Sequence, residues 1–68
     1  MQELIVVVEE APEGGYTARA LSAPIFTEAD TLAELPDQVR DAVRCHFEPD
    51  VVPRLIRLHL VKDEVIPA

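Results

Sequence analysis

The 68-residue sequence predicts a single α+β domain, spanning residues 1–68, in which three strands precede one helix and a fourth strand follows it. Three observations predict this βββαβ order. An unbroken apolar run from Leu4 to Val8 is typical of a central strand. Gly14 and Gly15 mark a tight turn, and a capping pattern at Thr31 precedes apolar residues at helical spacing. A chain this short has material for only one core, so one domain is expected.

The first three strands follow from alternation and turn signals. The first is expected at Glu3 to Glu10, where successive side chains point to opposite faces. Ile5 and Val7 therefore face away from the even-numbered apolar residues. The glycine turn leads into an antiparallel second strand at Tyr16 to Leu21, and a short third strand is expected at Ile25 to Thr27.

A helix is expected from about Leu32 to Phe47. Thr31 and Glu34 form the S/T-x-x-E capping box that satisfies orphan backbone donors at a helix start. Pro36 predicts a slight kink or a restart, because it lies beyond the positions where a missing N–H costs nothing. The stripe expected to pack on the sheet consists of Leu32, Leu35, Val39, Ala42, Val43 and His46.

The last strand is expected at Arg54 to Val61. Its apolar residues alternate with Arg57 and His59, which is the pattern of a half-exposed strand. Lys62 and Asp63 are interpreted as a turn, which leaves Glu64 to Ile66 as a ragged edge or a short additional strand.

One helix can cover only one face of such a sheet. Ile5, Val7 and Leu21, together with Tyr16, then need cover on the other face or form an exposed apolar patch. Exposed patches of this kind commonly mark interaction sites. We therefore expect a second copy of the chain or a partner protein to cover them.

The composition restricts the classes of partner. The formal net charge is −7 and the pI is near 4.5, so direct nucleic-acid binding, which needs a basic patch, is not expected. An acidic domain suits a basic protein partner, while solubility alone is the simpler explanation. No leader of the basic-then-apolar type opens the sequence, and Leu4 to Val8 is too short to span a bilayer. A cytoplasmic location without membrane contact is expected.

The chain's small size points to self-association. Its single cysteine, Cys45, excludes an intrachain disulfide and a cysteine-rich zinc site. Because a 68-residue domain is marginal by itself, a homo-oligomer is expected. The absence of Asn and the six prolines are features of thermophile proteins.

No catalytic, metal or cofactor site is predicted. Cys45 and His46 are helix neighbours, whose side chains point about 100° apart and do not converge on a metal. A reactive thiolate needs an electropositive setting, whereas Asp41 and Glu48 flank Cys45.

The carboxylates form two groups in the sequence. These are Glu9, Glu10 and Glu13 near the first hairpin, and Glu28, Asp30 and Glu34 before the helix. The second group is explained by the favourable interaction of acids with a helix N-terminus. For the first group, two interpretations stay open: a solvated turn, or a docking surface for a basic protein.

Three short motifs resemble the HicB-like antitoxin family. They are Gly14-Gly15-Tyr16-Thr17-Ala18, Thr27-Glu28-Ala29-Asp30-Thr31 and Glu34-Leu35. The resemblance covers roughly residues 3 to 61 and implies a degenerate ribonuclease-H-like sheet with one helix on one face. It also implies a partner, the small basic RNA-cleaving toxin HicA, and no ribonuclease activity of the chain's own.

The sequence departs from the family pattern in three places. Ala29 stands where the family usually has Gly, and Ser22-Ala23-Pro24-Ile25 replaces a Pro-x-x-Pro-Gly bend. Many family members continue into a DNA-binding segment, for which residues 62 to 68 are too short. Repression by direct DNA binding is therefore not carried over.

The sequence thus favours a non-catalytic, HicB-like binding module that sequesters a basic toxin. The residues expected to meet the partner are Glu9, Glu10, Glu13 and Tyr16, and those expected to form an oligomer face are Ile5, Val7 and Leu21. One alternative is an orphan structural or regulatory homo-oligomer without a toxin. Another is a small enzyme or ligand-binding subunit with Tyr16, His46 or His59 in an interface pocket.

Overall fold

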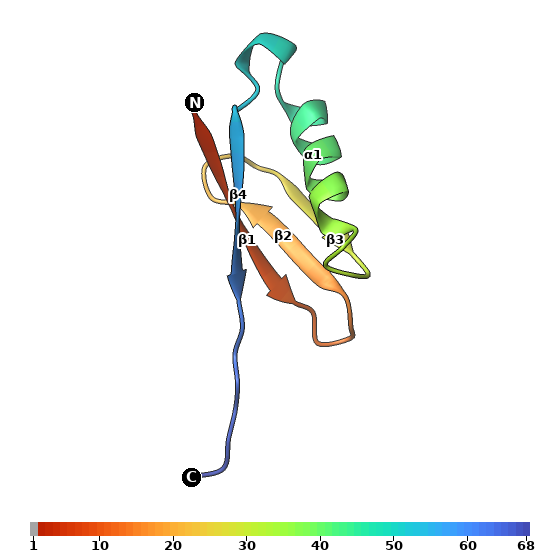
Figure 1. Cartoon of the computed structure of the whole chain (residues 1–68), viewed down its shortest axis with the longest axis vertical. Helices are drawn as coiled ribbons and strands as arrows, with labels where there is room; N and C mark the ends of the chain where they lie inside the picture. The colour runs from red at the N-terminus through yellow and green to blue at the C-terminus, as the bar shows by residue number, and fades with distance from the viewer. Residues whose placement is uncertain (1) are drawn as a thin grey trace.

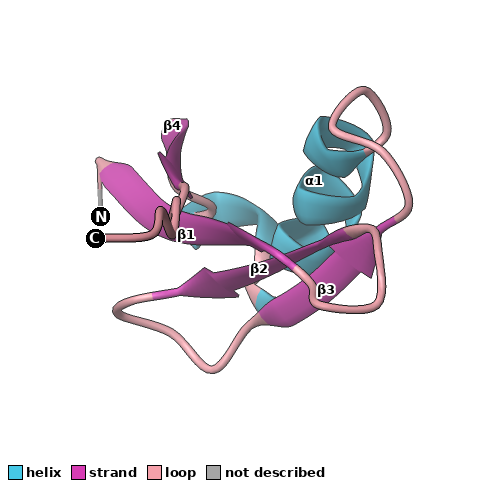
Figure 2. Cartoon of the chain, turned by 90° about the horizontal axis from the view of Figure 1, so that it is seen from below, coloured by secondary structure: helices cyan, strands magenta, loops and turns pink. Residues whose placement is uncertain are grey.

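The computed structural model describes residues 2–68 and shows a four-stranded mixed sheet with one helix on one face (Figures 1 and 2). The elements are β1 (Glu3–Glu10), β2 (Tyr16–Ala20), β3 (Phe26–Ala29), α1 (Leu35–His46), the 3-10 turn η1 (Pro49–Val51) and β4 (Leu55–Val61). The strand order is β3-β2-β1-β4. β1 and β3 run antiparallel to β2, whereas β4 runs parallel to β1. The predicted α+β class and βββαβ order are confirmed.

The third strand lies further along the chain than predicted, at Phe26–Ala29 rather than Ile25 to Thr27. Ile25 closes the connection from β2, because its carbonyl oxygen accepts a 3.0 Å hydrogen bond from the Ala20 backbone N–H. Its side chain is buried in the core. Ile25 is therefore a hydrophobic anchor before the strand, and β2 ends at Ala20, one residue earlier than expected.

The helix begins at Leu35, three residues later than predicted, and Pro36 lies in its first turn. No helix precedes Leu35, so the helix begins beside the proline instead of kinking or restarting there, and a proline in the first turn loses no intrahelical bond. Thr31 Oγ1 accepts a 3.2 Å bond from the Glu34 backbone N–H and donates one of 3.2 Å to Glu34 Oε1. These bonds close the turn that precedes the helix. Leu32 consequently lies outside α1, 42 % exposed, and does not belong to the packing stripe.

The core lies between α1 and the sheet face formed by the even-numbered residues of β1. Its fully buried hydrophobic members are Leu4, Val6, Val8, Ala18, Ile25, Leu35, Val39 and Val43. Seen along the sheet, α1 lies on one side only (Figure 2). His46, predicted on the same stripe, is exposed at the end of the helix, where its ring meets the Phe47 ring edge-on. Of the six predicted stripe residues, Leu35, Val39 and Val43 are buried and Ala42 packs against the core half-buried, whereas Leu32 and His46 do not belong to it.

β4 is the least covered strand of the sheet. Ile56 and Leu58 are only half-buried, and Leu60 is 56 % exposed, although all three face the helix side. On the opposite face, Arg57 donates hydrogen bonds to both carboxylate oxygens of Glu3, at 2.5 and 3.3 Å. These bonds lower the pKa of Glu3 below its ordinary value of 4.5.

The segment after β4, residues 62–68, continues away from the body of the molecule in an extended conformation (Figure 1). The predicted turn at Lys62 and Asp63 is not formed, and Glu64 to Ile66 form no strand within the chain. Val65 is 95 % and Ile66 is 72 % exposed. No helix within residues 2–68 has the length and apolar character needed to cross a membrane.

The boundary of α1 predicts unequal costs for two leucine truncations. Leu35→Ala empties a fully buried site and should lower the free energy of unfolding by about 2–5 kcal/mol. Leu32→Ala removes a partly exposed side chain outside the helix and should cost about 1 kcal/mol or less. Urea unfolding of both variants measures the difference. Equal losses in the free energy of unfolding would show that Leu32 packs on the sheet as predicted from the sequence.

The Glu3–Arg57 pair predicts a specific pH dependence. Because folding lowers the pKa of Glu3, the pair's contribution is complete above pH 4.5 and is lost as the pH falls through the lowered value. Arg57→Met should therefore reduce the stability lost between pH 7 and pH 3, measured by urea unfolding. Arg54→Met is the matched control and should leave that loss unchanged. An unaltered pH profile in Arg57→Met would show that the pair contributes nothing.

Candidate functional site

The first hairpin presents its acids at one end of the molecule. The turn from Ala11 to Gly15 is closed by two backbone bonds, from Ala11 N–H to the Gly15 oxygen (2.9 Å) and from Gly14 N–H to the Ala11 oxygen (3.0 Å). Gly14 and Gly15 have φ angles of 102° and 79°, which side chains rarely allow. The turn leaves Glu13 exposed at its tip.

The four residues predicted to meet a partner do not share one face. Glu10 pairs with Tyr16 across β1 and β2, and both lie on the helix side of the sheet. Glu9 lies on the opposite side, where its carboxylate is 3.9 Å from the Arg19 guanidinium. Tyr16 is half-buried and packs against the core, so it does not belong to the uncovered face as predicted. Glu10, Glu13 and Tyr16 remain together at one end.

The fold brings the second acidic group to the same end. Tyr16 is paired with Glu10 on β1 and with Ala29 on β3, so Glu28 and Asp30 lie beside the hairpin turn. Glu28 itself pairs with Thr17, so its side chain faces the uncovered side of the sheet, as that of Glu9 does. A shallow hollow of about 310 Å³ joins the two regions. It is lined by Gly14, Gly15, Tyr16, Glu28, Asp30 and Glu34, together with Ala11, Ala29 and Gln38. We name this surface, with Glu10 and Glu13, the acidic end.

Most charges of the acidic end are uncompensated. Within residues 2–68 the ion pairs involve the carboxylates of Glu3, Glu9 and Asp37. None of these belongs to the acidic end, and its carboxylates are instead exposed to water. The two acidic groups are separate in the sequence, so the sequence alone does not show that the second group lies beside the hairpin. The shifted position of β3 was the missing information, because it sets the register that pairs Ala29 with Tyr16 and so brings Asp30 and Glu34 beside the hairpin turn.

The residues predicted for an oligomer face do lie on the uncovered side of the sheet. Ile5 on β1 is 39 % exposed and Leu21, just after β2, is 57 % exposed, while Val7 on β1 is half-buried. Phe26, 62 % exposed, extends the patch onto β3, next to Arg19. The Glu3–Arg57 and Glu9–Arg19 pairs interrupt this face. It is therefore a mixed surface with a modest apolar centre.

The three residues considered for an enzyme are not brought together in one chain. His59 is exposed on the uncovered face of β4 and Tyr16 lies on the helix side of β2, while His46 ends the helix. Cys45 is also exposed. Within the part of the chain that the structure describes, no group of three or more His, Cys, Asp or Glu residues is arranged to hold a metal ion.

A small mixed sheet with one helix on one face and an acidic end defines a compact α+β domain. The sequence is 54 % identical over 52 residues to a UPF0150 protein of Archaeoglobus fulgidus, covering 76 % of this chain and 77 % of the relative. It is 35 % identical over 65 residues to a UPF0150 protein of Thermotoga maritima, covering 96 % of this chain and 91 % of the relative. The chain belongs to the UPF0150 family.

Two other comparisons found no relatives. No protein-family model matches the chain, and no solved structure matches it. Both UPF0150 relatives come from thermophilic organisms, which agrees with the thermophile-like composition. The family assignment therefore rests on sequence identity over most of the chain.

The two hairpin glycines predict an informative pair of variants. Either substitution by alanine should cost about 1–2 kcal/mol for the left-handed backbone. Gly15→Ala should cost more than Gly14→Ala, because its Cβ would lie 3.0 Å from the Ala29 carbonyl oxygen, whereas a Cβ on Gly14 meets nothing within 4 Å. Urea unfolding measures both. Equal costs would show that the hairpin does not lie tightly against β3.

Proposed function

We propose that this chain is a non-catalytic, HicB-like binding module that sequesters a small basic RNA-cleaving protein of the HicA type. The observation that carries the proposal is the hollow beside Tyr16, which is lined by Glu28, Asp30 and Glu34 and adjoins the hairpin that carries Glu10 and Glu13. The resemblance of the Gly14–Ala18 and Thr27–Thr31 motifs to the HicB-like family supplies the class of partner. Both motifs contribute residues to the acidic end.

The acidic end has the composition of a protein-docking site. Tyr16 is half-buried in a fixed position by its neighbours on β1 and β3. An aromatic ring held in this way offers contact area at a small entropic cost, and such anchors often dominate binding energy. The surrounding carboxylates accelerate encounter with a basic surface and select against acidic partners.

Sequestration requires no chemistry from this chain. An RNA-cleaving protein attracts its substrate with basic residues that contact phosphates. A surface of closely spaced, uncompensated carboxylates offers the same cations an alternative counter-charge. The acidic end would thereby occupy the RNA-binding surface of the partner and exclude RNA. Self-association is part of the proposal, because the domain is small and leaves an apolar patch and one sheet edge uncovered.

Variants in which carboxylates are replaced by uncharged amides test the docking surface. Glu10→Gln, Glu13→Gln and Glu28→Gln together remove three uncompensated charges of the acidic end. Asp41→Asn, Glu48→Gln and Asp50→Asn together change the net charge equally, at exposed positions on α1 and in the turns after it. The tagged chain is used to recover a partner from native lysate, and the purified partner is titrated calorimetrically with each variant.

The acidic-end variant should bind at least tenfold more weakly, with a smaller salt dependence, because the lost charges are those that meet the partner. The control should change the Kd by less than threefold. The recovered protein should be basic and should lose RNA cleavage when mixed with an equimolar amount of the chain. Equal weakening by both variants, or undiminished cleavage in the complex, would refute the proposal.

A further inference from the structure

The two edges of the sheet differ sharply. β3 is a four-residue edge that carries Glu28 and is covered by contact with α1. β4 is a seven-residue edge without proline or acidic residues, and its helix-side residues are only partly covered. Natural proteins protect long apolar edges, because unpaired N–H and C=O groups recruit another strand. On β4 this protection is limited to the polar side chains of Arg57 and His59, which both lie on the uncovered face.

The backbone direction of β4 identifies which groups are unpaired. The Leu55 N–H donates to the Gln2 carbonyl oxygen (3.1 Å), so Leu55 directs its backbone groups toward β1. Because N–H and C=O groups alternate in direction along a strand, those of Ile56, Leu58 and Leu60 point outward. If the same alternation continues into the extended segment 62–68, Pro67 falls at an inward position. Its missing N–H would then cost no bond at this edge.

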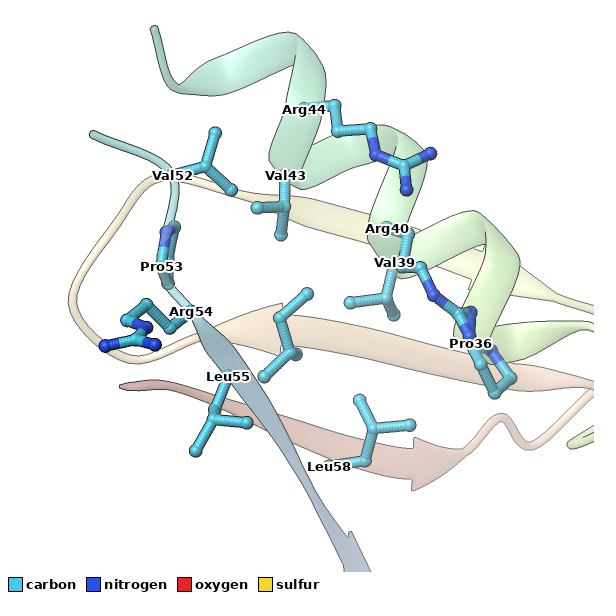
Figure 3. Close-up of a pocket in the computed structure, with 11 residues that line it drawn as sticks. Pro36, Val39, Arg40, Val43, Arg44, Val52, Pro53, Arg54, Leu55 and Leu58 are labelled. Atoms are coloured by element: carbon cyan, nitrogen blue, oxygen red, sulfur yellow. The ribbon is translucent and has the colours of Figure 1, made fainter. Parts of the chain in front are cut away.

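A groove adjoins this edge on the helix side (Figure 3). It measures about 360 Å³, and Val39, Val43, Ile56 and Leu58 form its apolar lining. Figure 3 shows the two valines on α1 and Leu58 on β4 directed into the space between these elements. Arg40, Arg44 and Arg54, half of the six basic residues of this acidic chain, also line the groove. An acidic segment with apolar side chains is the complementary ligand.

The chain itself carries such a segment. Residues 62–68 contain Asp63 and Glu64 followed by Val65 and Ile66, and they extend in line with β4 with their apolar side chains exposed (Figure 1). They point away from the groove of their own chain. A second copy related by a two-fold axis perpendicular to the sheet would run antiparallel and place its segment along the first copy's β4.

We propose that two copies of this chain pair through antiparallel β4 edges centred on Val61, each laying residues 62–68 along the other's β4 beside the arginine-lined groove. In this register His59 lies opposite Asp63 of the second copy, and Ile56 lies opposite Ile66 of the second copy. Glu64 of the second copy lies opposite Leu58, on the side of Arg40. Six hydrogen-bonded residue pairs, each exchanging two bonds, provide about twelve main-chain hydrogen bonds and join the two sheets into one.

Two variants at Leu60 distinguish the contribution of the backbone N–H to the pairing from that of the side chain. Leu60→Pro removes an outward N–H while leaving the bonds to β1, and Leu60→Ala removes the same side chain but keeps the N–H. Sedimentation equilibrium of the full chain should show a dimer for the wild type and for Leu60→Ala. Leu60→Pro should raise the dimer Kd at least tenfold, with a retained circular dichroism spectrum.

Disulfide trapping tests the register without disturbing the edge. In a Cys45→Ser background, Val61→Cys should become a disulfide-linked dimer under mild oxidation, because this position faces itself across a non-hydrogen-bonded pair. Val65→Cys, which is more exposed, should cross-link at least tenfold more slowly, since its two copies would lie about 27 Å apart. The measurement involves no toxin, so its result is independent of the proposed binding of a basic protein and bears only on self-association.

Several results would overturn this pairing. They are a monomeric wild type, equal dissociation of Leu60→Pro and Leu60→Ala, or equal cross-linking at positions 61 and 65. A dimer that survives Leu60→Pro but dissociates on Leu21→Asp would place self-association on the uncovered sheet face instead.

Discussion

The whole structure depends on the position of β1 in the centre of the sheet, between an antiparallel and a parallel neighbour. Its even-numbered residues are buried under α1, and this parity determines which side chains of β2 and β4 face the helix. A shift of one residue would move Leu4, Val6 and Val8 to the uncovered face and bring Ile5, Val7 and one of the flanking glutamates, Glu3 or Glu9, to the buried face. The continuous apolar run of β1 supplies stability, and the charged residues at its ends oppose a shift of register.

Charge is distributed as unevenly as hydrophobicity. Glu28 on β3 and the acids Asp30 and Glu34 in the turn before α1 line a hollow beside Tyr16, and the adjoining hairpin carries Glu10 and Glu13. Arginines from α1 and from the start of β4 gather along the groove. A chain with a net charge of −7 thus has two surfaces of different character, suited to different partners. The sheet keeps the two surfaces separate, because the acidic end lies at the hairpin and the β3 edge, whereas the groove lies beside the β4 edge.

The parts of the fold that the sequence predicts depend on local signals, whereas the parts that it does not predict depend on contacts between residues far apart in the sequence. The unbroken apolar run located β1 without error, and Pro36 indicated a discontinuity near the residue where the helix begins, because both signals are local. The position of β3 was wrong, since Ile25 looks like a strand residue until its carbonyl is seen to close the β2 connection. The acidic end could not be predicted from two separate groups of acids, because it depends on the pairing of Tyr16 with Ala29. For the same reason, no local pattern could place Tyr16 on the helix side of the finished sheet.

The parallel pairing of β1 with β4 also has a kinetic consequence. Glu3 and Arg57, which bond across these strands, are 54 residues apart in a 68-residue chain. The hairpin and β3 can assemble early from contacts between sequence neighbours, but the central strand keeps one edge open until the last strand arrives. Closure of that long loop makes the β1–β4 ladder the slow step expected of non-local strand pairing. During synthesis on the ribosome, the most apolar strand of the domain therefore waits longest for its second neighbour.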